Sequence, residues 1–427
     1  MKSKHITKLL AILAFVTISG QISAQNRISS PYSRFGIGDL LSNNGVFNMA
    51  MGGISYGVYS PYFVNNSNPA SYVAFDSLSF IFDVGAFAKL STLSNQNISQ
   101  KANFASLGNL KFGFPVTKWW KSSFGLQPYS MTGYSMLDSQ VDANQGNVNF
   151  LYEGDGGISQ FYFGNSYSLT RNLSVGFNLS YLFGTLNKSS RSEFPDSLLK
   201  LNYNVLNSAK VHDVYLDYGL FFHKQLASGL QYNAGLVFST NSNISATENR
   251  LGYTYFIGST GVELIRDTVL NEPEVKGNIL LPANAGFGFS LGKTDKWMAG
   301  ADIQWQQWEK FKYFGVSDSL KNSLRISVGG SYTPSITTVS GYWQRITYRA
   351  GLKYSSSYLE LRGKNIDEFG ISLGVGLPLP RTRSTINLAA EFGTRGTTSN
   401  NLIKDNYVKF TLGLSIFERW FIIRKYD

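Results

Sequence analysis

The stretch VGFNLSYLF, residues 175–183, alternates large apolar side chains with small or polar ones. Successive side chains of an extended strand point to opposite faces, so Val175, Phe177 and Leu179 fall on one face and Asn178 on the other. The pattern predicts a β-strand with one apolar face and one polar face.

The same alternation returns from residue 77 to residue 417. Counting hairpins predicts about 14 strands, an even number, as bacterial single-chain barrels require. We place the strands at residues 77–92, 101–116, 122–137, 148–169, 173–190, 208–226, 230–248, 273–292, 296–314, 321–333, 344–360, 367–378, 383–397 and 404–417.

The length and face contents of these strands separate a membrane barrel from a soluble sandwich. Sandwich strands run about five or six residues and carry a polar outer face. The predicted strands reach the roughly 9 to 11 residues that cross a hydrocarbon layer when tilted, and charges are sparse on their polar face. Apolar outside and polar inside is typical of a transmembrane antiparallel β-barrel. Helical spans are excluded, because no segment after the N-terminal leader is a continuous apolar run of spanning length.

The N-terminus has the features of a secretory signal peptide, residues 1–24. Lys2 and Lys4 precede an apolar run at 9–18, and small residues precede Gln25. The run is about half the roughly 20 residues of a spanning helix, so we expect cleavage and export to the cell outer membrane. The chain has no cysteine, so the exported fold needs no disulfide.

The composition is that of a strand-rich chain with few charges. Aromatic residues make up 15% and charged residues 15%, against about 25% charged in a soluble domain. The net charge is +11, but lysine and arginine are spread along the chain. A nucleic-acid binder would concentrate them on one face, so we expect outer-membrane lipids as partners and no nucleic acid.

Residues 25–76 lie between the signal peptide and the barrel at 77–417. Within them, MAMGGISYGVYSPYFVNNSNPASYV, residues 49–73, shows neither a helix period nor a strand period. It is too apolar and aromatic for a disordered linker. We therefore predict an N-terminal extension and a hatch, or plug, packed inside the lumen. Residues 418–427 form a predicted periplasmic tail.

The connections between strands predict the orientation of the barrel. Tight turns such as 170–172, 227–229 and 293–296 should be periplasmic. The longest connections, roughly 191–207 and 249–272, should be extracellular loops.

The chain resembles the FadL family of outer-membrane transporters of hydrophobic compounds. The resemblance rests on a Gly-rich segment and an Asn-Pro-Ala segment just before the first strand. These hatch residues are Met51, Gly52, Gly53, Asn68, Pro69 and Ala70. The resemblance implies that this segment is a hatch inside the barrel, and that the loops after strands five and seven form a hydrophobic entry groove. The run at 30–39 and the tail at 417–427 depart from the family pattern, which favours an accessory role.

No enzymatic chemistry is expected. The stretches at 288–292 and 370–374 match the Gly-X-Ser-X-Gly nucleophile pattern, but both lie in predicted strands, whereas that motif needs a strand-to-helix turn. His212 and His223 are eleven apart on one strand, so they face opposite sides and cannot share a site. A hydrolase is a minor hypothesis, and no cofactor or metal site is expected.

A set of residues is predicted to face the lumen, where it serves either as a salt-bridge network or as a ligand site. In the second interpretation, arginines meet an acidic head group and aromatic rings line an apolar tail site. The residues are Phe87, Tyr215, Asp217, Phe221, Asp302, Arg325, Arg345, Arg349 and Glu391.

Two functions remain open from the sequence. The leading hypothesis is passive uptake of a hydrophobic or amphipathic, fatty-acid-like small molecule through the outer loops and a hatch-gated lumen. The alternative is a non-transporting structural or accessory barrel subunit of an outer-membrane secretion or assembly complex.

Overall fold

The computed structural model describes residues 30–42, 44–143, 146–196, 200–258, 261–337 and 340–419. The predicted signal peptide and the last eight residues of the predicted tail lie outside the described residues. Among the residues described, no helix is long and apolar enough to span a membrane.

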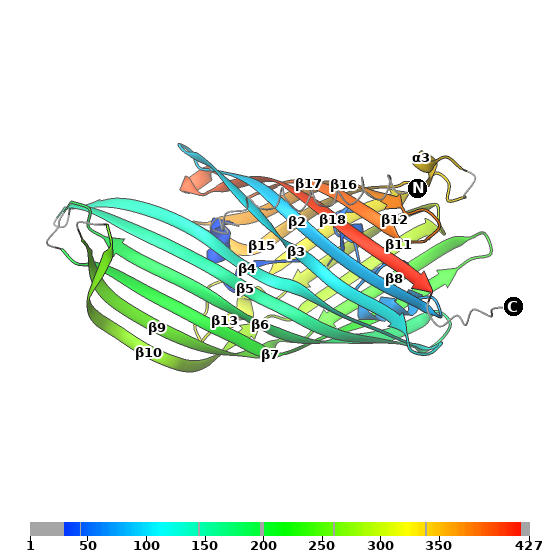
Figure 1. Ribbon diagram of the computed structural model, residues 1–427, viewed down its shortest axis with the longest axis horizontal. Coiled ribbons are helices and arrows are strands. Elements are labelled where there is room, and N and C mark those ends of the chain that lie inside the picture. Colours follow the sequence, from blue (N-terminus) through cyan, green and yellow to red (C-terminus); the bar gives the residue numbers. More distant parts are fainter. Residues whose placement is uncertain are drawn as a thin grey trace, which may run out of the picture.

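The chain folds into a closed antiparallel barrel of 14 wall strands, as predicted from the alternation (Figure 1). Each strand pairs with the next along the chain, and the last strand pairs with the first from Arg419–Ser79 to Lys404–Ser94, which closes the wall. The wall consists of β2 (Ser79–Ser94), β3 (Ser99–Pro115), β4 (Trp120–Asp142), β5 (Gly146–Ser168), β6 (Leu173–Glu193), β7 (Asn202–Gln225), β8 (Leu230–Ser239), β9 (Ser242–Ile257), β10 (Glu263–Leu281), β11 (Asn284–Lys293), β12 (Trp297–Gln306), β14 (Ser323–Tyr332), β15 (Thr347–Leu361), β16 (Lys364–Pro378), β17 (Thr385–Arg395) and β18 (Lys404–Arg419).

Two of the 14 wall strands are interrupted. β8 and β9 together form one wall strand, because both pair with β7, and β10 and β11 together form the next. Two further strands, β1 (Asp39–Leu40) and β13 (Lys312–Tyr313), are two residues long and lie beside the wall. The short helices are η2 (Pro31–Arg34), α2 (Val46–Met49), η3 (Pro69–Ala74), η4 (Trp308–Lys310), α3 (Tyr342–Arg345) and η5 (Ser399–Asn401).

The two faces of the wall differ as the alternation requires. On β6, Leu179 and Tyr181 are 43% and 46% exposed on the outer face, whereas Asn178 and Ser180 are buried against the interior. Burying such apolar side chains in a hydrocarbon layer is favourable, and the paired backbone leaves no open edge along most of the wall. The outer face is therefore the lipid-facing side of a membrane barrel.

The two longest connections were predicted as loops, but the structure shows that they consist largely of strand. Residues 249–272 belong mostly to β9 and β10, which pair and turn at 258–262, and residues 191–207 contain the ends of β6 and β7. The predicted strand at 296–314 is also too long, because β12 ends at Gln306 and η4 follows. Above the membrane both faces of a strand meet water, so the alternation that marks a strand disappears there.

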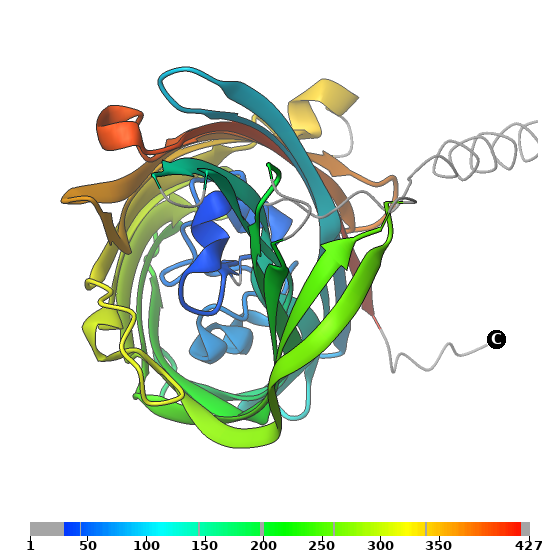
Figure 2. The same ribbon diagram turned by 90° about the vertical axis from the view of Figure 1, so that its left-hand side faces the viewer.

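Residues 30–76 lie inside the barrel (Figure 2). We call residues 30–42 the cap segment, because they contact the connections at the end of the barrel opposite Ser79 and Arg419. We call residues 44–76 the floor segment. In outer-membrane barrels the end with the chain termini is periplasmic.

One interruption of the wall lies between β3 and β4. Their pairing runs only from Pro115–Lys121 to Leu110–Leu126, whereas β4 stays paired with β5 as far as Asp142. Beyond this point the β2–β3 hairpin turns away from β4 (Figure 1). We call the gap the β3–β4 seam.

Candidate functional site

The floor segment packs its backbone directly against the inner wall at glycine positions. A Cβ atom at Gly176 of β6 would lie 2.6 Å from Ala70 N and 2.6 Å from Pro69 C. Other inward glycines on most wall strands also meet the floor, because the lack of a Cβ lets a backbone or a side chain approach closely. The floor backbone is met by Gly235 at Tyr56, Gly288 at Gly57, and Gly329 and Gly351 at Met51. Floor side chains are met by Gly113 at Phe75, Gly164 at Tyr72, Gly219 at Asn68 and Gly374 at Ala50.

This order shows how the floor segment runs. Residue 50 meets β16, residues 56 and 57 meet β8 and β11, and residue 75 meets β3, so the segment follows the inner circumference. The floor is therefore in contact with the wall around most of the barrel.

Polar wall side chains bond the floor backbone. The carboxylate of Asp302 on β12 accepts hydrogen bonds from Ser55 N at 2.6 Å and Tyr56 N at 2.9 Å. Ser166 and Ser174 each donate a hydroxyl to Ala70 O at 3.0 Å. Buried backbone groups need such partners, so these bonds hold the floor in register with the wall.

The predicted hatch residues lie at these contacts. Gly52 donates its N–H to Ser372 Oγ at 2.7 Å and has a φ of +70°, a conformation open to glycine. Asn68 accepts from Ala70 N at 3.1 Å, and its side-chain amide donates to Leu220 O at 3.2 Å. Met51 is fully buried. Whether these residues act as a hatch stays a prediction.

A polar chamber lies between the floor and cap segments. It has a volume of about 300 Å³ and is lined by residues of both segments. Its wall carries a coupled ion network in which Lys353 Nζ lies 2.6 Å from Glu391 Oε1 and 2.9 Å from Glu368 Oε1. Tyr407 donates its hydroxyl to Glu391 at 2.7 Å. Pairing offsets the free-energy cost of burying these charges. The network therefore favours a structural role over binding the apolar tail of a ligand.

The cap segment ties the outer ends of several strands together. Asp39 Oδ1 lies 2.7 Å from Arg395 Nη1, Tyr358 donates its hydroxyl to Gly38 O at 3.0 Å, and Gly36 N donates to Asp318 at 3.0 Å. Tyr32 donates its hydroxyl to Ile403 O and packs in an apolar cluster with Trp308 and Phe311. This cluster covers the outer end of the lumen.

The remaining predicted lumen residues divide into three groups. Asp217, Arg325 and Phe87 line the chamber, as does Tyr215, which donates its hydroxyl to Ser239 Oγ at 2.6 Å. Phe221 is buried beside the Tyr59 ring of the floor. Arg349 donates to Asn387 at 2.8 Å, and its guanidinium lies 4.0 Å from the centre of the Phe47 ring, so it supports the floor.

The prediction for Arg345 was wrong. It ends α3 in the turn between β14 and β15, outside the lumen, because β15 begins only at Thr347. The prediction extended the inward–outward alternation of β15 back to Arg345, although Arg345 lies in the turn before the strand.

The β3–β4 seam is closed inside the wall by apolar side chains. Phe87 on β2, Phe104 on β3 and Met131 on β4 form one cluster, and Leu41 of the cap segment packs against it. β1 pairs with the freed edge of β4 at Met131 and Ser130. The cap segment thus covers the seam from within.

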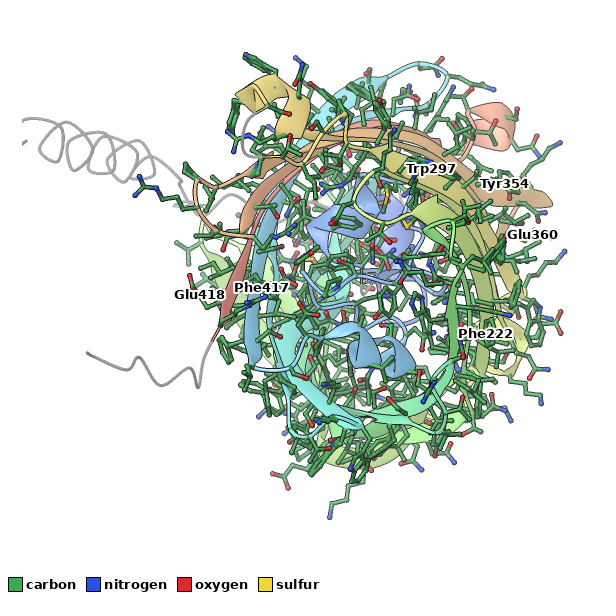
Figure 3. The ribbon with its side chains drawn as sticks, turned by 90° about the vertical axis from the view of Figure 1, so that its right-hand side faces the viewer. Phe222, Trp297, Tyr354, Glu360, Phe417 and Glu418 are labelled. Carbon is green, nitrogen blue, oxygen red and sulfur yellow. The ribbon has the colours of Figure 1, made fainter. Side chains whose placement is uncertain are left out.

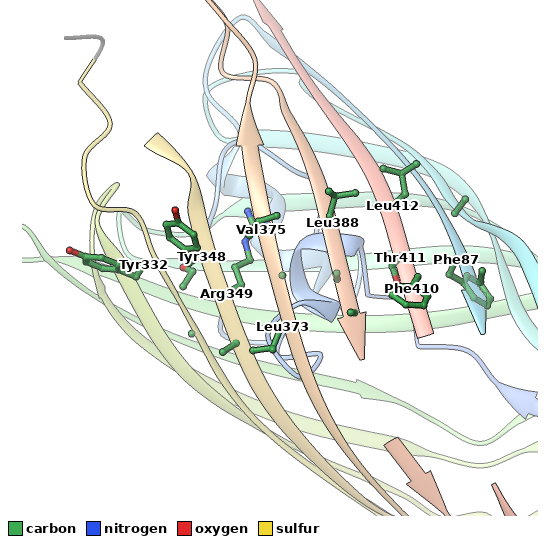
Figure 4. Close-up of a pocket in the computed structure, with 18 of the residues that line it drawn as sticks. Phe87, Tyr332, Tyr348, Arg349, Leu373, Val375, Leu388, Phe410, Thr411 and Leu412 are labelled. Carbon is green, nitrogen blue, oxygen red and sulfur yellow. The ribbon is translucent and has the colours of Figure 1, made fainter. Parts of the chain in front are cut away.

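The outer wall has a hollow of about 1620 Å³ across β12, β14–β18, β2 and β3 (Figure 4). Leu373 and Phe410, 52% and 50% exposed, lie in it. Alanines replace bulky residues at five outward positions in the hollow, namely Ala86, Ala88, Ala105, Ala350 and Ala390.

Seen from the periplasmic end, the floor segment and inward side chains fill the lumen (Figure 3).

A sequence model of the BamG family matches residues 5–427 of this chain. The chain belongs to the BamG family. Among curated proteins none matches it in sequence. Within the part of the chain that is described, no group of three or more His, Cys, Asp or Glu residues could hold a metal ion.

Solved structures resemble this BamG family member in fold. The Ralstonia pickettii toluene transporter TbuX has a TM-score of 0.58 at 14% identity, covering 88% of this chain and 98% of that chain. The Pseudomonas putida toluene transporter TodX has 0.56 at 17%, covering 90% and 100%. A Pseudomonas aeruginosa FadL homologue has 0.57 at 11%, covering 90% and 99%. The FadL resemblance is thus confirmed for the fold, while the family assigned by sequence is BamG.

TbuX and TodX are described as toluene transporters. This BamG barrel therefore shares the fold of these proteins. Sequence reasoning missed the cap contacts of Tyr32 and Asp39 and the wall glycines. A signal for the glycines was present, because Gly176, Gly219 and Gly235 fall on inward strand positions.

Proposed function

We propose that this chain is a plugged, non-conducting outer-membrane barrel that serves as an accessory subunit of an outer-membrane protein complex. The observation that carries the proposal is the contact between the floor backbone and the wall glycines around the barrel. An aqueous pore would require the floor to leave these contacts with the wall.

Three further features support a role on the surface of the barrel. The chamber is polar and small, the cap segment covers the outer end, and the wall outside is hollowed on one side. The final letter of the family name BamG is compatible with one subunit in a lettered series of subunits of a larger assembly.

The test is purification of the tagged, full-length chain from outer membranes in mild detergent. We expect a protein partner at stoichiometric amount. A lone monomer that carries a co-purified hydrophobic compound would overturn the proposal.

The second candidate function is sideways passage of a hydrophobic compound through the β3–β4 seam. It is favoured by the early end of the β3–β4 pairing and by the shared fold with toluene transporters. This route leaves the floor in place, since a compound would leave between Phe104 and Met131.

The absence of cysteine allows a direct test. Phe104→Cys with Met131→Cys, joined by a short bismaleimide, should abolish uptake of toluene if the seam is the route. The control pair is Phe163→Cys with Leu179→Cys, which joins β5 and β6 where they are already paired. Uptake that is unchanged by the seam cross-link would exclude this candidate.

A further inference from the structure

The outer wall of the barrel differs between its two sides. From β5 to β8 the outward positions carry bulky side chains, for example Phe163, Tyr181 and Phe222. In the hollow, alanines bring the backbone of β2, β3, β15 and β17 to the surface. The hollow is apolar and extends to the periplasmic ends of β12, β14 and β15, where Trp297, Tyr332 and Tyr348 line it.

Aromatic side chains mark the depth of this end of the hollow. Tyr342 and Trp343 of α3 are 42% and 76% exposed, and α3 projects outside the wall (Figure 2). Tryptophan and tyrosine favour the level of the lipid head groups. The ends of β12, β14 and β15 therefore lie at the periplasmic interface of the membrane.

The periplasmic turns beside the hollow are strongly basic. Turns 293–297, 333–346 and 379–384 contain Lys293, Lys296, Arg345, Arg381 and Arg383, with Asp295 as their one acidic residue. The turns on the bulky side, 116–119, 169–172 and 226–229, contain only Lys118 and Arg171 as charged residues. Positive charge is thus concentrated beside β12, β14 and β15, whereas the β18 and β2 end of the hollow carries exposed Glu418 and Asp76 together with Arg419.

Two of these cations lie next to residues of the hollow and have no acidic partner. Lys296 precedes Trp297, and Arg345 lies three residues before Tyr348. Among the described residues the ion pair of these turns joins Arg383 to Asp295, and neither Lys296 nor Arg345 takes part in one. The Arg345 guanidinium lies 5.6 Å from the centre of the Tyr342 ring, and its Nε has no hydrogen-bond partner among the described residues. A cationic group without an acidic partner at the head-group level attracts an anionic phosphate.

We propose that the hollow is a binding site for an anionic phospholipid of the periplasmic leaflet. Its acyl chains lie over Ala350 and Ala390, and its phosphate lies at Lys296 and Arg345. The charge of the rim selects an anionic head group over a neutral one, and the hollow supplies apolar contact that the bulky wall does not. The site is independent of the proposed accessory role, because it needs no protein partner.

The test uses the full-length chain in nanodiscs of phosphatidylethanolamine with phosphatidylglycerol, released into native mass spectrometry. The wild type should retain phosphatidylglycerol in excess over its share of the nanodisc. Lys296→Gln with Arg345→Gln should lower that excess by about fivefold for each cation removed. Arg171→Gln on the other side is the matched control and should leave it unchanged.

A second pair of variants tests the hollow itself. Ala350→Trp with Ala390→Trp should reduce retention of both lipids, while Ala234→Trp, an outward alanine on the bulky side, should not. Heat-modifiable electrophoretic mobility checks that each barrel is folded, and the turn variants Lys296→Gln and Arg345→Gln keep the test decisive if the tryptophan variants misfold. Retention in the same ratio as the nanodisc, or equal loss in the controls, would overturn the proposal.

Discussion

The floor segment and the cap segment occupy the same lumen but are held in different ways. The floor packs its backbone and side chains against wall glycines, and wall side chains such as Asp302 accept hydrogen bonds from its amides. The cap pairs its backbone with one wall strand, β4, and is otherwise held by side-chain contacts, among them Asp39 with Arg395 and Tyr358 with Gly38. The floor thus contacts most wall strands, whereas the backbone pairing of the cap is confined to β4. We therefore expect the cap and the β3–β4 seam to open before the floor leaves the wall.

The largest expected effect comes from filling a glycine contact. Gly176→Ala places a methyl group against Ala70 N and Pro69 C, so we expect the free energy of unfolding to fall by about 3 kcal/mol. The loss is measured as a shift in the urea concentration at which half of the folded barrel band disappears on an unheated electrophoresis gel. Gly341→Ala, where nothing lies within 4 Å, is the control and should be neutral. Equal midpoints for the two variants would break the comparison, because the floor would then not be closely packed.

A smaller effect should follow from removing a floor acceptor. Asp302→Ala leaves the amides of Ser55 and Tyr56 without their partner, and we expect a loss of about 2 kcal/mol. Asp302→Asn retains one acceptor oxygen and should lose less. Hydrogen exchange at Ser55 and Tyr56 should quicken in the alanine variant, and unchanged exchange would show that this side chain does not hold the floor.

The smallest effect is expected at the cap. Asp39→Asn weakens the 2.7 Å pair with Arg395, and we expect about 1 kcal/mol of lost stability. Hydrogen exchange should quicken in residues 30–42 and stay the same in residues 44–76. Glu360→Gln, which breaks the surface pair with Lys321, is the control and should change neither segment. Faster hydrogen exchange in the floor segment of the Asp39→Asn variant would contradict the account, because it would show that the cap and floor segments are not stabilised independently.

The wall was predictable because its signal is local. A strand with one face in lipid and one in the lumen must alternate, and residues such as Leu179 and Asn178 show this without a structure. The hairpin of β9 and β10 was predicted as a loop, since above the membrane water reaches both faces. Arg345 was misplaced because the inward–outward alternation was extended to residues that precede the start of β15.

The contacts within the lumen could not be predicted in the same way. Gly176 and Ala70 are distant in sequence, and nothing local to either indicates that they meet. The end of pairing at Leu110 and Leu126 is likewise a property of two strands together. The sequence indicated which residues face inward but not which partners they find.

The conductance of the wild-type barrel in a planar lipid bilayer tests the central claim most directly. The claim is that the floor segment does not leave the wall, so the account predicts no steady ionic current above that of the bare bilayer. A variant lacking residues 44–76, if its barrel still forms, is the positive control and should conduct. Steady, open-channel current through the wild type would contradict the account.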